Sequence, residues 1–198
     1  MKRTFVYVYS LLILVGWLNG CQSQRDTDNA EDSELPAPTS VKPVFVIDKP
    51  VSNQLNTLLE TYLAMKDSFV QSDTSAINRK TEAFLQSLTS LSAASLPEDA
   101  QSKWQNSQAM LSRAATTQRS VSSLDDKRAA FEDVSRLLYE VVNTFGAKAT
   151  VYKQYCPMAL NDKGAYWLST NKEIRNPYFG DQMLSCGEVQ EVLTFDQP

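Results

Sequence analysis

Four sulfur-bearing side chains gather in two short clusters near the end of this 198-residue chain. Cys156 and Met158 form the first cluster, and Met183 and Cys186 form the second, about thirty residues later. Thiolate and thioether sulfurs are soft ligands, which among physiological metals select Cu(I), with Ag(I) as its chemical analogue. Zinc is less favoured, because structural zinc sites generally use four Cys or His ligands. The spacing therefore predicts a soft-metal site formed by these four residues.

The two cysteines also support a second interpretation. Cysteines of an exported protein usually pair, because disulfides persist in oxidising compartments. A disulfide between Cys156 and Cys186 would close a loop of about thirty residues and stabilise the fold by roughly 3–4 kcal/mol in the chain-entropy model. Met158 and Met183 would then be gap-filling core residues. One protein can adopt both the disulfide-bonded and the metal-bound state, because only the reduced cysteine pair can bind Cu(I). The sequence does not decide between these two states.

Aromatic residues stand close to both sulfur clusters in the sequence. We expect four of them to support the site: Tyr155, Trp167, Tyr178 and Phe179. The face of Trp167 could cap a bound cation, although an aromatic ring beside such a site more often only packs.

The first residues of the chain predict export. Met1-Lys2-Arg3 is a short basic start, and an apolar run from Phe5 to Trp17 follows it. A basic region, a short apolar region and a small-residue cleavage site together indicate a signal peptide, which we assign to residues 1–20. Leu18-Asn19-Gly20-Cys21 matches the lipobox of bacterial lipoproteins, so Cys21 is the expected lipidation site. We therefore expect a lipid-anchored protein of the bacterial cell envelope, at the periplasmic face or the outer membrane.

The composition excludes several kinds of function. The chain contains no histidine, which removes Ser-His-Asp and Cys-His catalysis and any histidine metal ligand. Its net charge is −4 and it has no basic run, so we expect no nucleic-acid partner. Acidic residues of the C-terminal part show no spacing typical of an acid/base pair. We expect no enzymatic activity.

The segments before the sulfur clusters predict a helical support. Residues 21–43 are polar and acidic with little to bury, so we expect a disordered tether. Residues 44–150 contain four amphipathic stretches, and the short connections between them favour an up-down antiparallel four-helix bundle. The stretches run over residues 51–71 and 75–91, from Pro97 to about Ala115, and from Ser123 to Phe145. Asp73 or Thr74 is expected to cap the second helix, Ser123 to open the fourth, and Gly146 to end it.

The remaining segments predict a mainly α-helical fold with a small β component. Residues 151–198 alternate β-prone stretches with turns, and we expect an irregular or short-β tail that packs on the bundle within the same domain. The apolar run Val44–Ile47 is compatible with either a strand or a lid on the core.

Several motifs together resemble a known family, the domain of unknown function 3347. They are Tyr155–Ala159, Gly164–Ser169, Glu173–Gly180 and Met183–Val189, with weaker likeness in Tyr62–Lys66 and Arg128–Phe131. The resemblance extends over about Val51–Val189. It implies an exported protein of Bacteroidetes-type bacteria, and similar domains occur on periplasmic adaptor subunits of heavy-metal efflux pumps.

The resemblance implies a context for the sulfur clusters. The expected function is a lipid-anchored envelope protein that binds Cu(I) or Ag(I) and is accessory to heavy-metal efflux or buffering, with an efflux adaptor subunit as partner. The alternative is a disulfide-stapled protein-interaction module of an efflux or envelope complex, with no metal.

Overall fold

Four long helices form most of the chain in this computed structural model, which describes residues 35–195. The predicted signal peptide and the predicted lipidation site Cys21 lie outside the described residues. The helices are α1 (Lys49–Val70), α2 (Thr74–Ser90), α3 (Glu98–Ser120) and α4 (Leu124–Phe145), with a short 3-10 helix, η1 (Ala93–Ser95), between α2 and α3. All four lie where the sequence predicts helices.

The ends of the helices follow local side-chain chemistry. The Asp73 carboxylate accepts the backbone N–H of the residue three positions on, at 2.9 Å, and so caps α2. Ser123 caps α4 in the same way at 3.0 Å. Gly146 ends α4 with a φ of +83°, which favours glycine. Pro97, expected in the first turn of α3, stands one position earlier as its N-cap residue.

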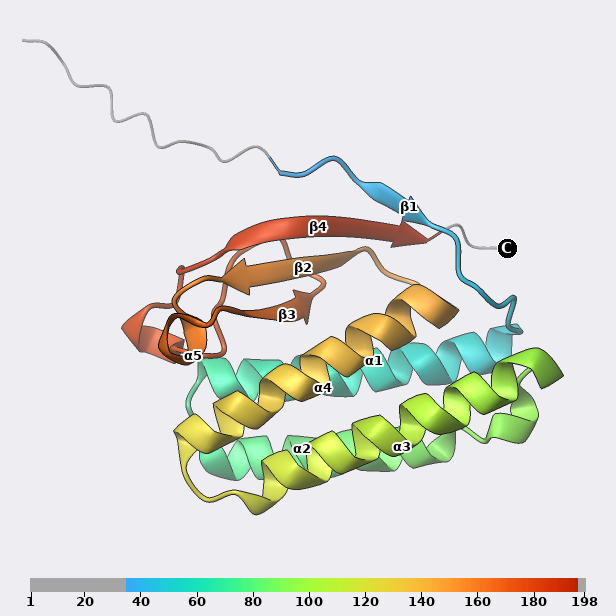
Figure 1. Cartoon of the computed structure of the whole chain (residues 1–198), viewed down its shortest axis with the longest axis horizontal. Helices are drawn as coiled ribbons and strands as arrows, with labels where there is room; N and C mark the ends of the chain where they lie inside the picture. Colours follow the sequence, from blue (N-terminus) through green and yellow to red (C-terminus); the bar gives the residue numbers. More distant parts are fainter. Residues whose placement is uncertain (1–34, 196–198) are drawn as a thin grey trace, which may run out of the picture. The chain divides into compact units, whose positions relative to one another are not determined.

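Helices that are consecutive in the sequence pack against each other. α1 packs on α2, α2 on α3 and α3 on α4, while α1 and α4 share fewer contacts. Their apolar faces meet in a buried core. The four helices lie side by side (Figure 1). The largest fully buried side chains are Trp104, Trp167, Tyr62, Phe69, Phe84 and Phe131.

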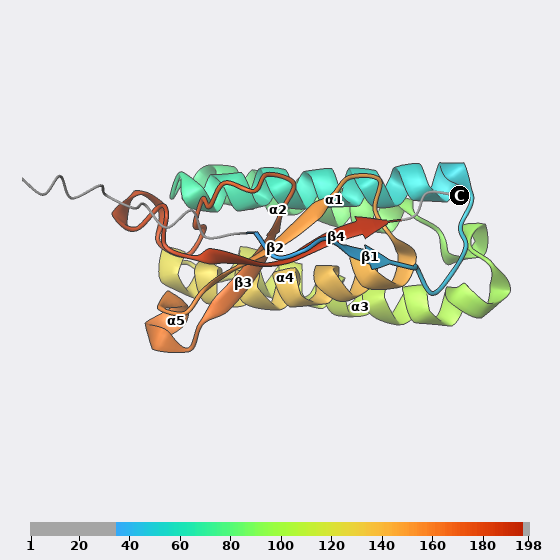
Figure 2. The ribbon, with the colours of Figure 1, turned by 90° about the horizontal axis from the view of Figure 1, so that it is seen from above.

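A four-stranded sheet covers one side of the helices. Its strands are β1 (Thr39–Val41), β2 (Val151–Cys156), β3 (Ala165–Ser169) and β4 (Glu188–Phe195), in the order β1-β4-β2-β3. β2 pairs antiparallel with β3 and β4, and β1 pairs parallel with β4. The one-turn α5 (Ala159–Asp162) follows β2, and the 3-10 helix η2 (Gly180–Gln182) precedes β4. The strands lie over α1 and α4, with α2 and α3 on the far side (Figures 1 and 2). The expected mainly helical fold with short C-terminal strands is confirmed.

The ordered chain starts earlier than the sequence predicts. Residues 39–41, which we assigned to the tether, form β1 along the edge of β4. Composition does not predict this strand, because edge pairing uses backbone hydrogen bonds and needs little apolar burial. The predicted tether must therefore end before Thr39, and its first part, residues 21–34, lies outside the described residues.

The apolar run 44–47 is not a strand. It folds back on the end of α4, where the backbone N–H groups of Val44 and Phe45 donate to the carbonyl oxygen of Thr144 at 2.9 and 3.4 Å. Phe45 stacks on Phe145 with ring centroids 5.6 Å apart. The run therefore acts as a lid on this end of the core, one of the two roles that the sequence left open.

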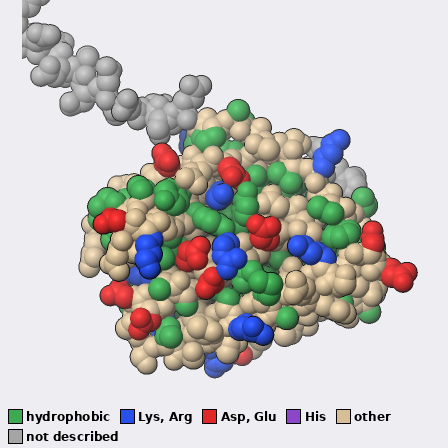
Figure 3. Space-filling view, in the orientation of Figure 1, with side chains coloured by type: hydrophobic (Ala, Val, Ile, Leu, Met, Phe, Trp, Pro, Cys, Tyr) green, Lys and Arg blue, Asp and Glu red, His purple; other side chains and the backbone are tan. Residues whose placement is uncertain are grey.

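The described helices and one face of the molecule bear on membrane crossing and on the distribution of charge. Within residues 35–195, every helix is too short or too polar to cross a bilayer. Acidic and basic side chains are intermingled over the face seen in Figure 3.

Candidate functional site

The two cysteines of the sulfur clusters meet at one end of the sheet. Cys156 is the last residue of β2, and Cys186 stands two positions before β4. Because β2 and β4 are antiparallel neighbours, with Tyr155 opposite Glu188, the end of one strand lies beside the start of the other. The two Sγ atoms are 2.6 Å apart. Cys156 is fully buried, whereas Cys186 is partly exposed.

Gly187 allows this close approach. A Cβ atom at this position would lie 2.7 Å from the carbonyl oxygen of Tyr155 and 3.1 Å from the Trp167 ring. The φ of Gly187 is +137°, which other residues rarely adopt. Glycine is therefore required where the chain passes from Cys186 into β4.

A buried asparagine holds the segment before Cys186. The Asn176 side-chain amide donates to the carbonyl oxygen of Cys186 at 2.7 Å. Its side-chain oxygen accepts the backbone N–H groups of Tyr178 and Phe179 at 2.8 and 3.3 Å. This Asx arrangement fixes the Asn-Pro-Tyr-Phe-Gly turn and ties it to the backbone of Cys186.

A buried glutamine holds the segment after β3. The Gln154 side chain accepts a hydrogen bond from Nε1 of Trp167 at 2.7 Å. Its Nε2 group faces the carbonyl oxygens of residues 171, 172 and 173 at 2.9–3.2 Å. Gln154 thus connects β2, β3 and the segment that follows β3, and it satisfies the polar atom of the buried Trp167 ring.

Hydrogen bonds also anchor the sheet and its loops to the helices. The Tyr62 hydroxyl on α1 accepts the backbone N–H of Leu168 in β3 at 3.1 Å. On α4, Nε of the buried Arg128 donates to the carbonyl oxygen of Pro177 at 3.1 Å. The Tyr178 hydroxyl donates to the carbonyl oxygen of Tyr166 at 2.8 Å. Burial raises the pKa values of Tyr62 and Tyr178 well above their usual range, so both phenols stay protonated.

The four aromatic residues expected to support the site have different roles. Trp167 and Tyr178 are buried and contact each other edge to face, with centroids 6.0 Å apart. Phe179 is partly buried against the core at the start of η2. Tyr155 is partly exposed, and its ring leans over Gly164 at the turn before β3. The face of Trp167 is occupied by packing, which supports the structural interpretation of that ring.

The methionines stand in the loops that flank the cysteines. Met158 follows Cys156 and is 45% exposed. Met183 ends η2 and is partly exposed, and its carbonyl oxygen accepts the backbone N–H of Cys186 at 3.1 Å. Residues 160–162, just after Met158, have positive φ values of 54–61°. Such left-handed backbone is unfavourable for residues other than glycine and marks a tightly constrained turn.

The spacing of the two Sγ atoms decides which chemistry fits the site as it stands. A metal ion lies roughly 2.3 Å from each thiolate, so two sulfurs that share an ion are about 3.8–4.6 Å apart. The observed separation of 2.6 Å is too short for a shared ion. Across residues 35–195, no cluster of three or more His, Cys, Asp or Glu side chains is placed to hold a metal, a set that does not include the two methionines. The two cysteines are not bonded to each other in the structure. Their separation is longer than a disulfide bond of about 2.05 Å, yet it is closer to that length than to the spacing of two thiolates that share an ion.

The Cys186 thiol of the reduced pair is held in its protonated form. Burial, together with the hydrogen bond and charge of Cys156, raises the pKa of Cys186 from 9.0 to about 11. A thiol with such a pKa is protonated at neutral pH and is a poor ligand or nucleophile until it loses its proton.

Sequence reasoning missed the polar residues that hold the site together. Three of these residues are buried and hydrogen-bonded: Gln154, Asn176 and Arg128. Each is an isolated polar residue, and no repeated pattern in the sequence predicts that it is buried. The Asn-Pro-Tyr-Phe-Gly stretch did predict a turn, but the bond from Asn176 to Cys186 depends on tertiary structure.

Comparisons with known proteins identify a family and no function. Residues 58–150 match the model of a family described as protein of unknown function (DUF3347). No curated protein matches the chain, and neither does any solved structure. The match covers most of α1 through α4 and confirms the predicted resemblance there. The sulfur clusters lie beyond the matched residues.

Proposed function

We propose that this chain, which belongs to the DUF3347 family through residues 58–150, is a protein-interaction module stapled by a disulfide between Cys156 and Cys186. The observation that carries the proposal is the 2.6 Å separation of the two Sγ atoms. The staple joins the ends of β2 and β4 and closes the loop that contains Asn176 and the exposed Met158. It keeps this loop in one conformation, so binding a partner costs little conformational entropy.

The helices serve as the platform for the stapled loop. We propose that α1–α4 form an up-down antiparallel bundle, which the packing of consecutive helices supports. Arg128 and Tyr62 connect this platform to the loop and the sheet by hydrogen bonds. The module has no catalytic role in this proposal.

The setting of the module is the bacterial cell envelope. The lipobox at Cys21 supports anchoring through an N-terminal lipid, and export would place the cysteines where disulfides persist. The partner that fits the family context is an adaptor subunit of a heavy-metal efflux pump. Met158 is the exposed apolar side chain that the stapled loop offers to such a partner, and exposed methionines are common at binding surfaces.

The test is binding of the oxidised full-length chain to a purified efflux adaptor, measured by surface plasmon resonance. We expect reversible binding that Met158→Asp weakens by about tenfold or more, as for a side chain in the centre of an interface. Met110→Asp is the matched control, because Met110 is also 45% exposed but lies on α3. Absence of binding, or equal losses in the two variants, would refute the proposed interaction.

A soft-metal function is the second candidate. It is favoured by the exposure of Met158 and the partial exposure of Met183 and Cys186, three of the four residues of the predicted site. The sulfurs of the cysteines would have to separate to about 4 Å to hold Cu(I) or Ag(I) between them. Titration of the reduced chain with Cu(I) against a competing chelator tests this function. It predicts an affinity that falls in the Met158→Leu, Met183→Leu double variant, and an unchanged affinity would exclude the site.

A further inference from the structure

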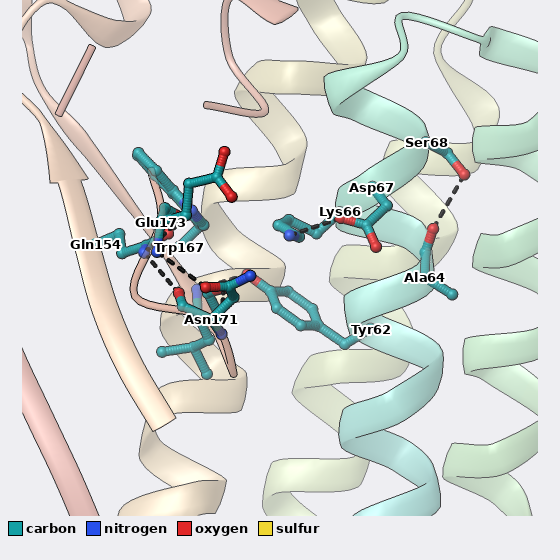
Figure 4. Close-up of polar contacts among 11 residues, drawn as sticks. Tyr62, Ala64, Lys66, Asp67, Ser68, Gln154, Trp167, Asn171 and Glu173 are labelled. Atoms are coloured by element: carbon teal, nitrogen blue, oxygen red, sulfur yellow. Dashed lines mark hydrogen bonds and ion pairs between the residues drawn. The ribbon is translucent and has the colours of Figure 1, made fainter. Parts of the chain in front are cut away.

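A polar pocket lies between α1 and the segment that follows β3. Its volume is about 330 Å³, and its lining includes Lys66, Asp67, Ser169, Asn171, Glu173 and Arg175. This volume is within the range of small-molecule sites, roughly 300–1,000 Å³. The pocket contains none of the sulfur-bearing residues, so it is separate from the cysteine pair. Figure 4 shows Lys66 extending from α1 toward the segment that carries Asn171 and Glu173.

The ammonium group of Lys66 is fixed in this pocket. Its side chain is only 7% exposed, and Nζ lies 2.6 Å from the carboxylate of Asp67. An ammonium group has three N–H donors, and Asp67 accepts one of them. The Asp67 side chain is 55% exposed. Asp67 can therefore turn out into water at little cost, whereas Lys66 stays buried and would need another anion in its place.

The opposite wall of the pocket is rigid. Gln154 holds the carbonyl oxygens of residues 171–173, and the side-chain oxygen of Asn171 accepts the backbone N–H of Glu173 at 3.1 Å. Ser169 Oγ accepts the backbone N–H of Asn171 at 3.0 Å. The carboxylate of Glu173 and the guanidinium of Arg175 extend from this wall without an ion pair among the described residues. Glu173 and Arg175 are both exposed, so their charges are solvated and are available to a ligand.

We propose that this pocket binds a small zwitterion of the α-amino acid type. The lining carries two cations, Lys66 and Arg175, and two carboxylates, Asp67 and Glu173, so it offers no net attraction to a purely anionic or cationic ligand. The ligand's carboxylate replaces Asp67 at Lys66 and is shared with Arg175. Its ammonium group faces Glu173 and the displaced Asp67, and the hydroxyl group of Thr170 and the side-chain amide of Asn171 offer further hydrogen bonds.

The experiment is calorimetric titration of the full-length chain with glycine and L-alanine, compared with acetate and methylammonium chloride at equal ionic strength. We expect saturable binding of an amino acid with a Kd of about 1 mM or tighter, and at least about tenfold weaker binding of acetate and methylammonium. Lys66→Met is expected to abolish binding, and the exposed Arg175→Gln to weaken it about tenfold. Lys172→Gln is the matched control, because Lys172 lies on the same segment outside the pocket.

Each result of these titrations either supports or overturns the proposed amino-acid site. An amino acid that binds the control about tenfold more tightly than it binds Arg175→Gln supports the site, even if Lys66→Met does not fold, as circular dichroism would reveal. The proposal is overturned if neither amino acid binds, if acetate binds equally well, or if Arg175→Gln and Lys172→Gln bind alike. None of these results depends on the redox state of the cysteines.

Discussion

Replacing Asn176 by alanine tests whether buried hydrogen bonds hold the stapled loop. The side chain makes three hydrogen bonds, to the carbonyl oxygen of Cys186 and to the backbone N–H groups of Tyr178 and Phe179. At about 1 kcal/mol for each bond, Asn176→Ala lowers the free energy of unfolding by about 3 kcal/mol. For a folded unit of this size the loss corresponds to a decrease in Tm of about 6–12 °C.

Urea unfolding followed by circular dichroism measures this loss, with the cysteines kept in one redox state. Asn171→Ala is the control, because Asn171 is exposed and its side chain accepts only the backbone N–H of Glu173. We expect the control to lose no more than about 1 kcal/mol. If both variants lose the same free energy, or if Asn176→Ala loses less than about 1 kcal/mol, the hydrogen bonds of Asn176 do not hold the loop.

Three further predictions concern other parts of the site. Gly187→Ala should lower the free energy of unfolding by about 2–4 kcal/mol, because its Cβ would overlap the backbone oxygen of Tyr155; urea midpoints comparable to wild type would contradict this. Tyr62→Phe should lower it by about 1–3 kcal/mol, because the buried N–H of Leu168 loses its acceptor, and hydrogen exchange at Leu168 should quicken. In the reduced protein, the contribution of Cys186 to stability should be constant below pH 9.0 and fall as pH rises toward about 11, because the unfolded chain loses the Cys186 proton first. A Cys186→Ser variant should lack the part of the decrease in urea midpoint that Cys186 causes. A pH profile identical to that of the reduced wild-type protein would refute the assignment of this decrease to Cys186.

Much of the fold was predictable because it depends on local patterns. Each helix repeats apolar residues over several turns, and Asp73, Ser123 and Gly146 fix the helix ends through contacts within a few residues. The strands β2 and β3 follow stretches rich in β-branched and aromatic residues. By contrast, β1 has three residues and is stabilised by backbone pairing with β4, at the other end of the chain. No local pattern predicts that pairing.

The candidate site was predictable only in part. The sequence indicated that Cys156 and Cys186 belong together, and the antiparallel pairing of β2 with β4 brings their sulfurs into contact. It gave no indication of the pocket beside Lys66, because a single lysine on a helix is usually a solvated residue. Lys66 is buried only because the segment after β3 folds over α1, a contact between residues about one hundred positions apart.

The most direct test of the proposed staple is the redox state of the two cysteines in protein isolated from its own compartment. The full-length chain would be unfolded in denaturant, alkylated without reductant and analysed by intact mass and peptide mapping. The disulfide predicts that Cys156 and Cys186 remain unalkylated, are joined in one cross-linked peptide, and are alkylated only after reduction. Alkylation of both cysteines without reductant would contradict the stapled module and leave the soft-metal site as the interpretation of this cysteine pair.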